Sequence, residues 1–536
     1  MKKIISLLLA VVMILTVAAF AVSAKEYTQP FTQYGDNYEN IVEGSKTYRI
    51  PALYTLSNGA VLAVADKRYD HGSDSPNNID VLAAISPDGY TGWQYNCINY
   101  LEDYPDDKTA TDAASFIDSA VAQSSTGRIF VISDACPSGG GYWQAQKGTG
   151  FYNMYLSETE VYRGLLLTDS AYAGDLSTFK YCVGPFNGEL ATIYKKGNAE
   201  ADKYSNGEWK WTATEYAVNG EFELYKNGAP LTMKQKGTDK VIAQNIFYKD
   251  AELTCYLTTY LMMRYSDDNG ATWSAPILIS SQVKSENEGF LGIGPGRGLV
   301  TEYKGKERII FAVYDNAGAG VTPELDENVS TIYSDDNGVT WHRGAETTCR
   351  SMMTKTSEAQ IVELGGGKLR MFARNKGRYV AYADSTDGGH SWTKFRSDLD
   401  LPSNGNCMFS FINAEVGGKQ FVLGSYASNK NARADGVIRV GEVKGGDIDW
   451  TKTYYINDGF YAYSCLTQLA DGNIGLLYEG KADEVTYMVL SLDKDGNLSE
   501  INGNNFKGTP SVPSNEKTLR AFYGFFDKIL SLFGLI

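Results

Sequence analysis

An eight-residue motif that occurs three times constrains the fold of this chain more than any other feature. The copies cover residues 266–273, 334–341 and 385–392, and they read SDDNGATW, SDDNGVTW and STDGGHSW. Fainter versions at residues 86–93 and 493–497 extend the repeat over most of the chain. Self-similar segments of this kind are typical of architectures built from repeated supersecondary units.

Each copy of the motif has the chemistry of a tight hairpin turn. An aspartate can accept hydrogen bonds from nearby backbone amides, glycine adopts the positive φ that such turns need, and tryptophan can pack beneath the hairpin. Strand-rich stretches such as 256–265 and 309–314 precede the turns, and sustained helical periodicity is lacking in the core. The sequence therefore predicts an all-β fold, a β-propeller. A β-sandwich is the alternative, although a sandwich needs no recurrent turn motif.

The two ends of the chain differ from this core. Residues 1–24 combine two lysines, an apolar run and small residues before a cleavage position, which predicts a signal peptide and a secreted or cell-surface protein. Residues 506–516 contain two prolines and are predicted to be a linker. Residues 517–536 carry an apolar stripe that predicts an amphipathic helix. This helix would dock on the propeller or contact a membrane or a partner, and it is too short to span a bilayer.

The core itself, residues 25–505, is predicted to be discontinuous. Between residues 157 and 245 the motif spacing stretches and Asn-Gly turn signals separate short β-rich runs, which predicts a small inserted β domain. Trp209 and Trp211 alternate with polar neighbours there. They could bind carbohydrate, or they could form the core of a hairpin, and the sequence leaves both roles open.

Charge and rare residues exclude several function classes. The formal net charge of −15 disfavours nucleic acid as a partner, so an anionic ligand must meet a local basic cluster. Seven cysteines lack CxxC spacing, and three histidines lack a zinc-binding or serine-hydrolase setting. We therefore expect no metal and no cofactor. Carboxylates, tyrosines and arginines are the expected active groups, and the protein is expected to be a monomer.

Arg49 is the first candidate for a functional cation. It lies within the apolar run Tyr48–Leu53, which is predicted to be a strand. Burying a guanidinium without an anion is costly, so Arg49 either forms a structural salt bridge or awaits an anionic ligand. The sequence around it does not decide between the two.

Several further motifs follow Arg49 in a characteristic order. The Arg-Ile-Pro motif at residues 49–51 precedes the repeated aspartate-containing turns, and between and after them lie the stretches 71–80, 115–118, 358–363, 372–375 and 461–466. Taken together over residues 45–500, this ordered set resembles the bacterial sialidase family. The turns alone are weak evidence because other secreted propellers use them, whereas the ordered set is specific.

The resemblance implies a six-bladed propeller in which three arginines converge on the carboxylate of sialic acid. In this sequence they are Arg49, Arg374 and Arg433, with Arg439 as the alternative to Arg433. Planar guanidinium groups bind a carboxylate in a bidentate manner, and several of them fix the orientation of the sugar ring as well as its charge.

The resemblance also assigns catalytic roles to three residues. Asp74 would be the acid/base, although a loop aspartate is by default a turn cap. Tyr463 would be the nucleophile, and Glu358 would be the base that accepts its proton. A neutral phenol avoids the repulsion that a carboxylate nucleophile would meet beside the sugar's own carboxylate. Tyr461 competes with Tyr463, since residues two apart in a strand share a face.

Two further residues complete the expected site. Arg68 would pair with Asp74 or the sugar, and Asp118 would contact ring substituents, while a salt bridge and a strand-end cap are their structural alternatives. The expected activity is that of an exo-α-sialidase, which hydrolyses terminal sialic acid from glycoconjugates with retention. An intramolecular trans-sialidase that releases an anhydro sugar, and a sialoglycan-binding propeller without catalysis, are the alternatives. The expected partners are sialylated glycans.

Overall fold

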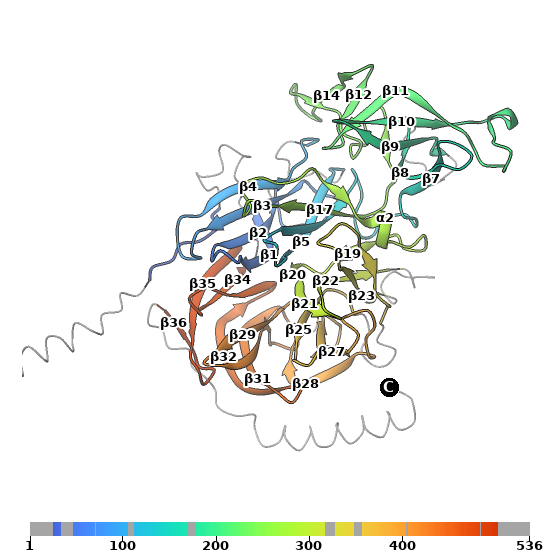
Figure 1. The fold of residues 1–536 in the computed structure, drawn as a ribbon. Helices are drawn as coiled ribbons and strands as arrows, with labels where there is room; N and C mark the ends of the chain where they lie inside the picture. The colour runs from blue at the N-terminus through green and yellow to red at the C-terminus, as the bar shows by residue number, and fades with distance from the viewer. Residues whose placement is uncertain are drawn as a thin grey trace, which may run out of the picture.

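The computed structural model describes residues 25–33, 45, 47–69, 71–104, 112–169, 178–316, 327–347, 356–403, 406–482 and 484–501. Within these residues the fold is all-β, with a ring of antiparallel sheets and one further sheet projecting from its edge (Figure 1). The helical elements in the described ranges are two short ones, η3 (Glu200–Asp202) and α2 (Ser280–Val283). The predicted all-β class is confirmed.

The N-terminal part of the ring is a nine-stranded sheet. Its main path runs β1-β2-β3-β5-β6-β17-β18, with β4 paired to β3 and β20 paired to β5. The strands are β1 (Thr47–Thr55), β2 (Val61–Arg68), β3 (Ile79–Ser86), β4 (Gln94–Asn99), β5 (Ser115–Gln123), β6 (Ile129–Cys136), β17 (Tyr260–Ser266), β18 (Ile277–Leu278) and β20 (Gly296–Arg297).

Four smaller antiparallel sheets continue the ring, and the last three are meanders of consecutive strands. The first has five strands, β19 (Leu291–Ile293), β21 (Leu299–Tyr303), β22 (Lys306–Asp315), β23 (Asn328–Ser334) and β24 (His342–Arg343). The next sheet has four strands, β25 (Ala359–Glu363), β26 (Leu369–Ala373), β27 (Tyr379–Ser385) and β28 (Arg396–Pro402). Another four-stranded sheet follows, with β29 (Ser410–Val416), β30 (Lys419–Ala427), β31 (Ala434–Lys444) and β32 (Asp447–Phe460). The last consists of β33 (Ser464–Gln468), β34 (Ile474–Lys481), β35 (Glu484–Leu492) and β36 (Leu498–Glu500).

Apolar side chains hold neighbouring sheets face to face. One buried cluster joins β29–β32 to β33–β36, and another joins β25–β28 to β29–β32. A third cluster packs Leu53 and Val61 of the first strands against Leu477 and Val489 of the last sheet. Because the first and last sheets pack together in this way, the ring closes as a propeller does.

The repeated motif forms the predicted turn. In the first copy, Asp268 accepts hydrogen bonds from the Thr272 amide at 2.9 Å and the Thr272 hydroxyl at 2.6 Å. In the second copy, Gly338 has a φ of +80°, and a Cβ there would lie 2.3 Å from the ring of Phe130. Trp341 packs edge to face on the same ring. The motif therefore closes a hairpin and presses its turn against the neighbouring sheet.

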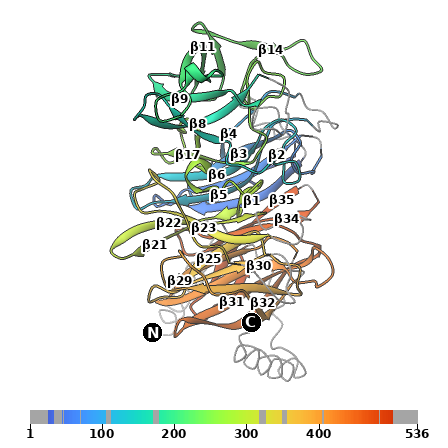
Figure 2. The ribbon, with the colours of Figure 1, turned by 90° about the vertical axis from the view of Figure 1, so that its right-hand side faces the viewer.

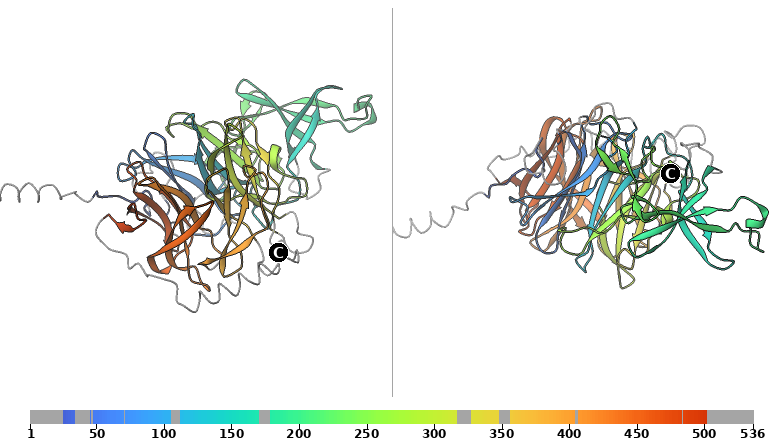
Figure 3. Two further views of the ribbon diagram at one scale, coloured as in Figure 1. Left: turned by 60° about the horizontal axis from the view of Figure 1, so that its bottom comes forward. Right: turned by 90° about the horizontal axis from the view of Figure 1, so that it is seen from above.

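A separate eight-stranded sheet projects from the edge of the ring, as Figures 2 and 3 show from three directions. It consists of β7 (Phe151–Tyr155), β8 (Val161–Thr168), β9 (Tyr181–Asn187), β10 (Leu190–Lys196), β11 (Trp211–Asn219), β12 (Leu224–Lys226), β13 (Ala229–Pro230) and β16 (Thr254–Cys255), beside the hairpin β14 (Thr232–Lys234) and β15 (Val241–Ala243). The predicted insertion at 157–245 falls within this span, and its boundaries as a domain stay a prediction. Trp211 is buried against Met154 and Cys182, which is a core role.

Three sequence predictions fall outside the described residues: the signal peptide at 1–24, the linker at 506–516 and the helix at 517–536. No helix in the described part of the chain combines the length and the hydrophobicity needed to cross a bilayer. Six of the seven cysteines lie in the described ranges, and these six are free thiols.

Candidate active site

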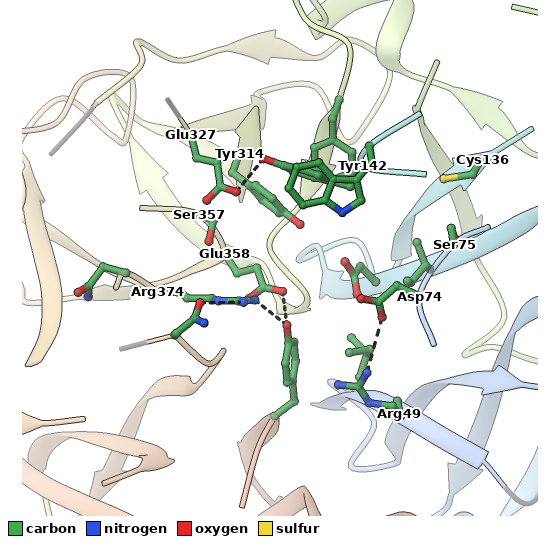
Figure 4. Close-up of a pocket in the computed structure, with 18 of the residues that line it drawn as sticks. Arg49, Asp74, Ser75, Cys136, Tyr142, Tyr314, Glu327, Ser357, Glu358 and Arg374 are labelled. Carbon is green, nitrogen blue, oxygen red and sulfur yellow. Dashed lines mark hydrogen bonds and ion pairs between the residues drawn. The ribbon is translucent and has the colours of Figure 1, made fainter. Parts of the chain in front are cut away.

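A cavity of about 340 Å³ opens where strands from different sheets of the ring converge. Figure 4 shows its walls, with Arg49 and Asp74 on one side and Arg374 with Glu358 on the other. Seven of the eight residues predicted from the sequence line this cavity: Arg49, Asp74, Asp118, Glu358, Arg374, Arg433 and Tyr463. The eighth, Arg68, is fully buried and bonded to Asp74. The fold thus brings together groups that are up to 414 residues apart in the chain.

Tyr463, Glu358 and Arg374 form a hydrogen-bonded triad at the floor of the cavity. The Tyr463 hydroxyl donates to Oε1 of Glu358 at 2.6 Å and accepts a hydrogen bond from Nη1 of Arg374 at 2.9 Å. Nη1 of Arg374 also donates to Oε2 of Glu358 at 2.6 Å. Burial and the charge of Glu358 raise the pKa of Tyr463 well above its usual value, although Arg374 opposes the shift. The phenol is therefore neutral in the unliganded site, with a base in contact with its proton.

Arg49 is held by a buried carboxylate that the sequence analysis missed. Its Nε and Nη2 donate to the two carboxylate oxygens of Glu479 at 3.1 and 3.4 Å, and Oε1 of Glu479 also accepts from the Ile50 amide at 3.0 Å. Glu479 lies near the end of β34, directly after the apolar run Ile474–Tyr478. A charged residue in an apolar strand is the same signal that drew attention to Arg49; it marks Glu479 as a buried charge that needs a partner, without showing which residue the partner is.

Both alternatives that the sequence left open for Arg49 are therefore realised at once. The bidentate contact with Glu479 is a structural salt bridge, and the Nη1 atom faces the cavity side, donating to the Gly72 carbonyl at 3.2 Å and lying 3.6 Å from Oδ1 of Asp74. The side chain keeps 15% of its surface exposed. An incoming anion can therefore still reach the guanidinium.

Asp74 lies at the mouth of the cavity, where it forms ion pairs with two arginines. Its side chain is 71% exposed, and Oδ1 accepts a hydrogen bond from Nη1 of Arg68 at 2.6 Å. Nη2 of Arg68 donates to Oδ2 of the buried Asp66 at 2.8 Å, so Arg68 is fixed from behind. Burial raises the pKa of Asp74, but the charges of Arg68 and Arg49 outweigh it and hold the pKa below its ordinary value. Asp74 is a carboxylate at neutral pH while the site is empty.

Asp118 enters the cavity from a distorted point of β5. Its φ is +59°, and the pairing of β5 with β6 shifts register between Ile117 and Ala120. Bulges of this kind re-aim a side chain, and strain of this kind persists where the surrounding structure enforces it. Burial, together with the charges of Asp66 and Glu358, raises the pKa of Asp118 well above its usual value. The surroundings of Asp118 therefore favour its protonated form, which is the form that can donate a hydrogen bond into the cavity.

The third predicted arginine, Arg433, precedes β31 and reaches the same cavity. Its Nη2 donates to the Asn406 carbonyl at 3.3 Å, and its guanidinium lies 5.5 Å from the centre of the Tyr463 ring. Arg49 lies at 5.6 Å from the same ring. The alternative, Arg439, is buried within β31 and does not line the cavity. The structure therefore selects Arg433.

The structure also separates the two candidate tyrosines, and it corrects one step of the sequence argument. Residues 461–463 lie between β32 and β33 rather than within a strand, so Tyr461 and Tyr463 do not share a face. Tyr461 is fully buried, with its hydroxyl bonded to that of Ser425 at 2.5 Å and its ring stacked on Tyr478. Only Tyr463 of the two lines the cavity.

One group of carboxylates in the described residues has the spacing of a metal site. Ligand atoms of Glu288, Asp315 and Glu346 lie within 4.8 Å of one another. Nη2 of Arg343 already bridges Glu288 at 3.1 Å and Asp315 at 2.8 Å. Since a guanidinium supplies positive charge to two of the three carboxylates, nothing in this cluster calls for a metal ion.

Comparison with known proteins identifies the class. The family described as BNR repeat-like domain matches residues 199–476, which is more than half of the chain. The chain is 32% identical to the anhydrosialidase of Macrobdella decora over 84% of its own length and 60% of that protein, and 29% identical to sialidase B of Streptococcus pneumoniae over 81% and 61%. The crystal structure of the intramolecular trans-sialidase from Ruminococcus gnavus, in complex with oseltamivir carboxylate, superposes with a TM-score of 0.67 at 32% identity, covering 86% of this chain and 93% of that one.

These matches and the site geometry agree. The chain belongs to the bacterial sialidase family, whose members carry BNR repeats on a β-propeller. It spans about 60% of the length of the two relatives named above from sequence comparison.

Proposed function

We propose that this protein is a retaining glycosidase that removes terminal sialic acid from glycoconjugates, an exo-α-sialidase, through a covalent intermediate on Tyr463. The observation that carries the proposal is the contact of the Tyr463 hydroxyl with Glu358 at 2.6 Å, opposite Asp74, in a cavity that three arginines line. A nucleophile, its base, an acid and an anion-binding cluster are thereby present in one site.

Binding starts with the carboxylate of the sugar. Arg49, Arg374 and Arg433 approach the cavity from three different sheets, so together they can hold a planar carboxylate from more than one direction. Two of them lie over the Tyr463 ring, which places the bound carboxylate and the adjacent anomeric carbon close to the phenol oxygen. The net charge of −15 makes this cluster a local exception that favours an anionic sugar.

Substrate binding then prepares Asp74 to act as an acid. In the empty site the charges of Arg68 and Arg49 lower the pKa of Asp74. A substrate carboxylate bound to Arg49 neutralises part of that positive charge and adds a negative charge nearby, and both changes raise the pKa of Asp74. The protonated form then donates its proton to the glycosidic oxygen, and the carboxylate later activates water.

The nucleophilic step uses the phenol. Glu358 removes the Tyr463 proton while Arg374, which donates to the same oxygen, stabilises the developing phenolate. A carboxylate nucleophile would be repelled by the substrate carboxylate, by roughly 1–4 kcal/mol at about 4 Å, whereas the neutral phenol is not. Sialidases with a tyrosine nucleophile are a known exception to the two-carboxylate rule for glycosidases.

A second reaction on the same site has a specific observation in its favour. At 32% identity the chain resembles one protein described as an anhydrosialidase and another described as an intramolecular trans-sialidase. In such a reaction a hydroxyl of the bound sugar, instead of water, attacks the intermediate, and an anhydro sugar leaves. A non-catalytic sialoglycan-binding role is disfavoured, because binding needs the arginines but not the contact between Tyr463 and Glu358.

Architecture and location complete the proposal. We propose that the propeller has six blades; this is supported by the meander of β1–β4, by the second set of β5, β6, β17 and β18, and by the single pairing of Ile79 with Ser115 between β3 and β5. An experimental structure in which β3 and β5 pair along their whole length would contradict six separate blades. We also propose that the protein is secreted or held at the cell surface, because residues 1–24 are predicted to be a signal peptide; detection of the protein only in the cytoplasmic fraction would contradict this.

A product-resolved assay tests the proposed function. Proton NMR of the purified protein with sialyl-lactose is expected to show release of sialic acid, with the α-anomer appearing first because the configuration is retained. An anhydro sugar as the sole product would establish intramolecular transfer in place of hydrolysis. Binding of sialyl-lactose without turnover of it or of an aryl sialoside would leave only the binding role.

Glu479→Gln is expected to weaken both the fold and substrate binding. The substitution keeps the shape but removes the charge that pairs with Arg49, and losing one partner of a largely buried pair costs about 2–4 kcal/mol in the free energy of unfolding. With Arg49 less firmly oriented, the KM for sialyl-lactose should rise about tenfold or more, with a smaller change in kcat. Urea unfolding and steady-state kinetics measure the two effects. Glu484→Gln on the neighbouring strand β35, where Glu484 lies 3.5 Å from Lys481 at the surface, is the control and should change neither.

A further inference from the structure

An aromatic side chain at the rim of the cavity has no role in the mechanism above. Trp143 lines the cavity, yet 59% of its surface is exposed. It lies on the segment between β6 and β7, shortly after the three glycines 139–141. A large exposed aromatic ring beside a binding site is most readily explained by a ligand that covers it.

The segment that carries Trp143 is held in place from several sides. The ring of Tyr142 packs on Phe290 with centroids 4.8 Å apart, and its hydroxyl donates to Oε1 of Glu327 at 2.7 Å. Trp143 meets the Tyr142 ring edge to face at 4.9 Å. In Figure 4 the pair Tyr142 and Glu327 lies across the cavity from Arg49. The indole is therefore presented by an anchored support, so little conformational entropy is lost when a ligand covers it.

The same segment is pressed against the loop of Asp74. A Cβ at Gly141 would lie 2.3 Å from the carbonyl oxygen of Ser75, the residue that follows Asp74. Such an approach is open only to glycine, which gives a physical reason for glycine at position 141. The segment that carries the indole is thus packed against the loop that carries the acid.

The position of the acid fixes where the leaving group must lie. Asp74 has to come within hydrogen-bond reach of the glycosidic oxygen, while the arginines hold the carboxylate that is attached to the same anomeric carbon. The sugar attached through that oxygen therefore extends from the Asp74 side of the cavity towards the rim. Trp143 is an exposed aromatic side chain of this cavity, and it lies on the segment that packs against the Asp74 loop.

We propose that the indole of Trp143 is the platform on which the first neutral sugar of the leaving group stacks, and that it determines specificity for sialic acid linked to a pyranose. This inference rests on the proposed function. The apolar face of a pyranose ring covers an aromatic ring well. A neutral sugar needs no charged partner, and it therefore suits a rim that contains Tyr142, Trp143 and Phe290.

Trp143→Ala separates this role from the others when substrates with different leaving groups are compared. For sialyl-lactose, kcat/KM is expected to fall about five- to tenfold, mainly through KM, as a lost stacking contact implies. For methyl α-sialoside and for α-sialyl fluoride, which have no second ring, kcat/KM should stay within twofold of wild type. Trp143→Tyr should recover most of the loss for sialyl-lactose because an aromatic face is restored. Phe186→Ala removes a ring that is 51% exposed on β9 of the projecting sheet, and it should change none of these values.

Two outcomes would overturn the inference. An equal fall on all three substrates would show that Trp143 supports the Asp74 loop rather than the leaving sugar, and the proposed function would survive. An unchanged kcat/KM for sialyl-lactose would show that the sugar does not contact the indole. Failure of the proposed function looks different, because wild-type protein would then cleave none of the three substrates.

Discussion

Replacing Tyr463 with phenylalanine is expected to lower kcat on sialyl-lactose by about three orders of magnitude or more, the scale seen when the nucleophile of a covalent mechanism is removed. Phenylalanine keeps the ring between Arg49 and Arg433, so binding of the substrate should change little. It removes the oxygen that contacts Glu358 and Arg374. Steady-state kinetics measure the loss, and direct titration with sialyl-lactose measures the remaining affinity.

The chain offers a closely matched control two residues away. Tyr461→Phe removes a hydroxyl that is bonded to Ser425 in the core and lies outside the cavity. This variant should lose about 1 kcal/mol of stability and keep most of its activity. A second measurement locates the covalent bond. A sialyl fluoride that carries another fluorine on the carbon next to the anomeric carbon slows breakdown of the intermediate. Peptide mass spectrometry of the trapped protein should then find the sugar on Tyr463. Wild-type turnover in the Tyr463→Phe variant would refute the assignment.

Replacing Asp74 with asparagine is expected to have an effect that depends on the leaving group. Asparagine keeps the approximate shape beside Arg68 and Arg49 but cannot donate an acidic proton. For sialyl-lactose, kcat/KM should fall by about 10²–10⁴, the usual contribution of a general acid. For α-sialyl fluoride the loss should be tenfold at most, because fluoride leaves without a proton.

The comparison of the two substrates makes this assignment testable. Added azide, which attacks the intermediate without a base, should accelerate turnover of the fluoride by the variant and yield a sialyl azide. Asp239→Asn, at a surface position where the aspartate side chain is 97% exposed, serves as the control and should behave as wild type. Equal losses on both substrates would mean that Asp74 mainly orders the two arginines and does not protonate the leaving group.

Residues within the repeated motif illustrate what could be predicted from sequence. Asp268 bonds to Thr272, four residues later, and Ser266 accepts from the amide of Gly270 at 2.8 Å. All of these contacts lie within eight residues, so the turn is recognisable in any copy and the all-β class follows from its repetition. The order of motifs likewise pointed to Arg49 and Arg374 and to three residues predicted to be catalytic, all of which line one cavity, while it left Arg433 and Arg439 as alternatives.

Other contacts in the site could not be predicted from the sequence, for a physical reason that three residues illustrate. Glu479 is 430 residues from Arg49 and adjacent to it only because the last sheet packs on the first. Asp66, which fixes Arg68 from behind, and Trp143, which borders the acid, carry no sequence pattern that marks them as functional. Contacts of this kind depend on ring closure, and a local pattern contains no information about which strands become neighbours.

The sequence by itself therefore determined the class of fold, the turns that build it and the chemical identity of the groups in the site. Only the tertiary structure decided that Tyr463 faces the cavity while Tyr461 is buried, that Arg433 rather than Arg439 joins the arginine cluster, and that Glu479 holds Arg49. The physical reason is range: hydrogen bonds within a hairpin turn are encoded by adjacent residues, whereas the direction of a side chain at the centre of the ring depends on every sheet packed around it.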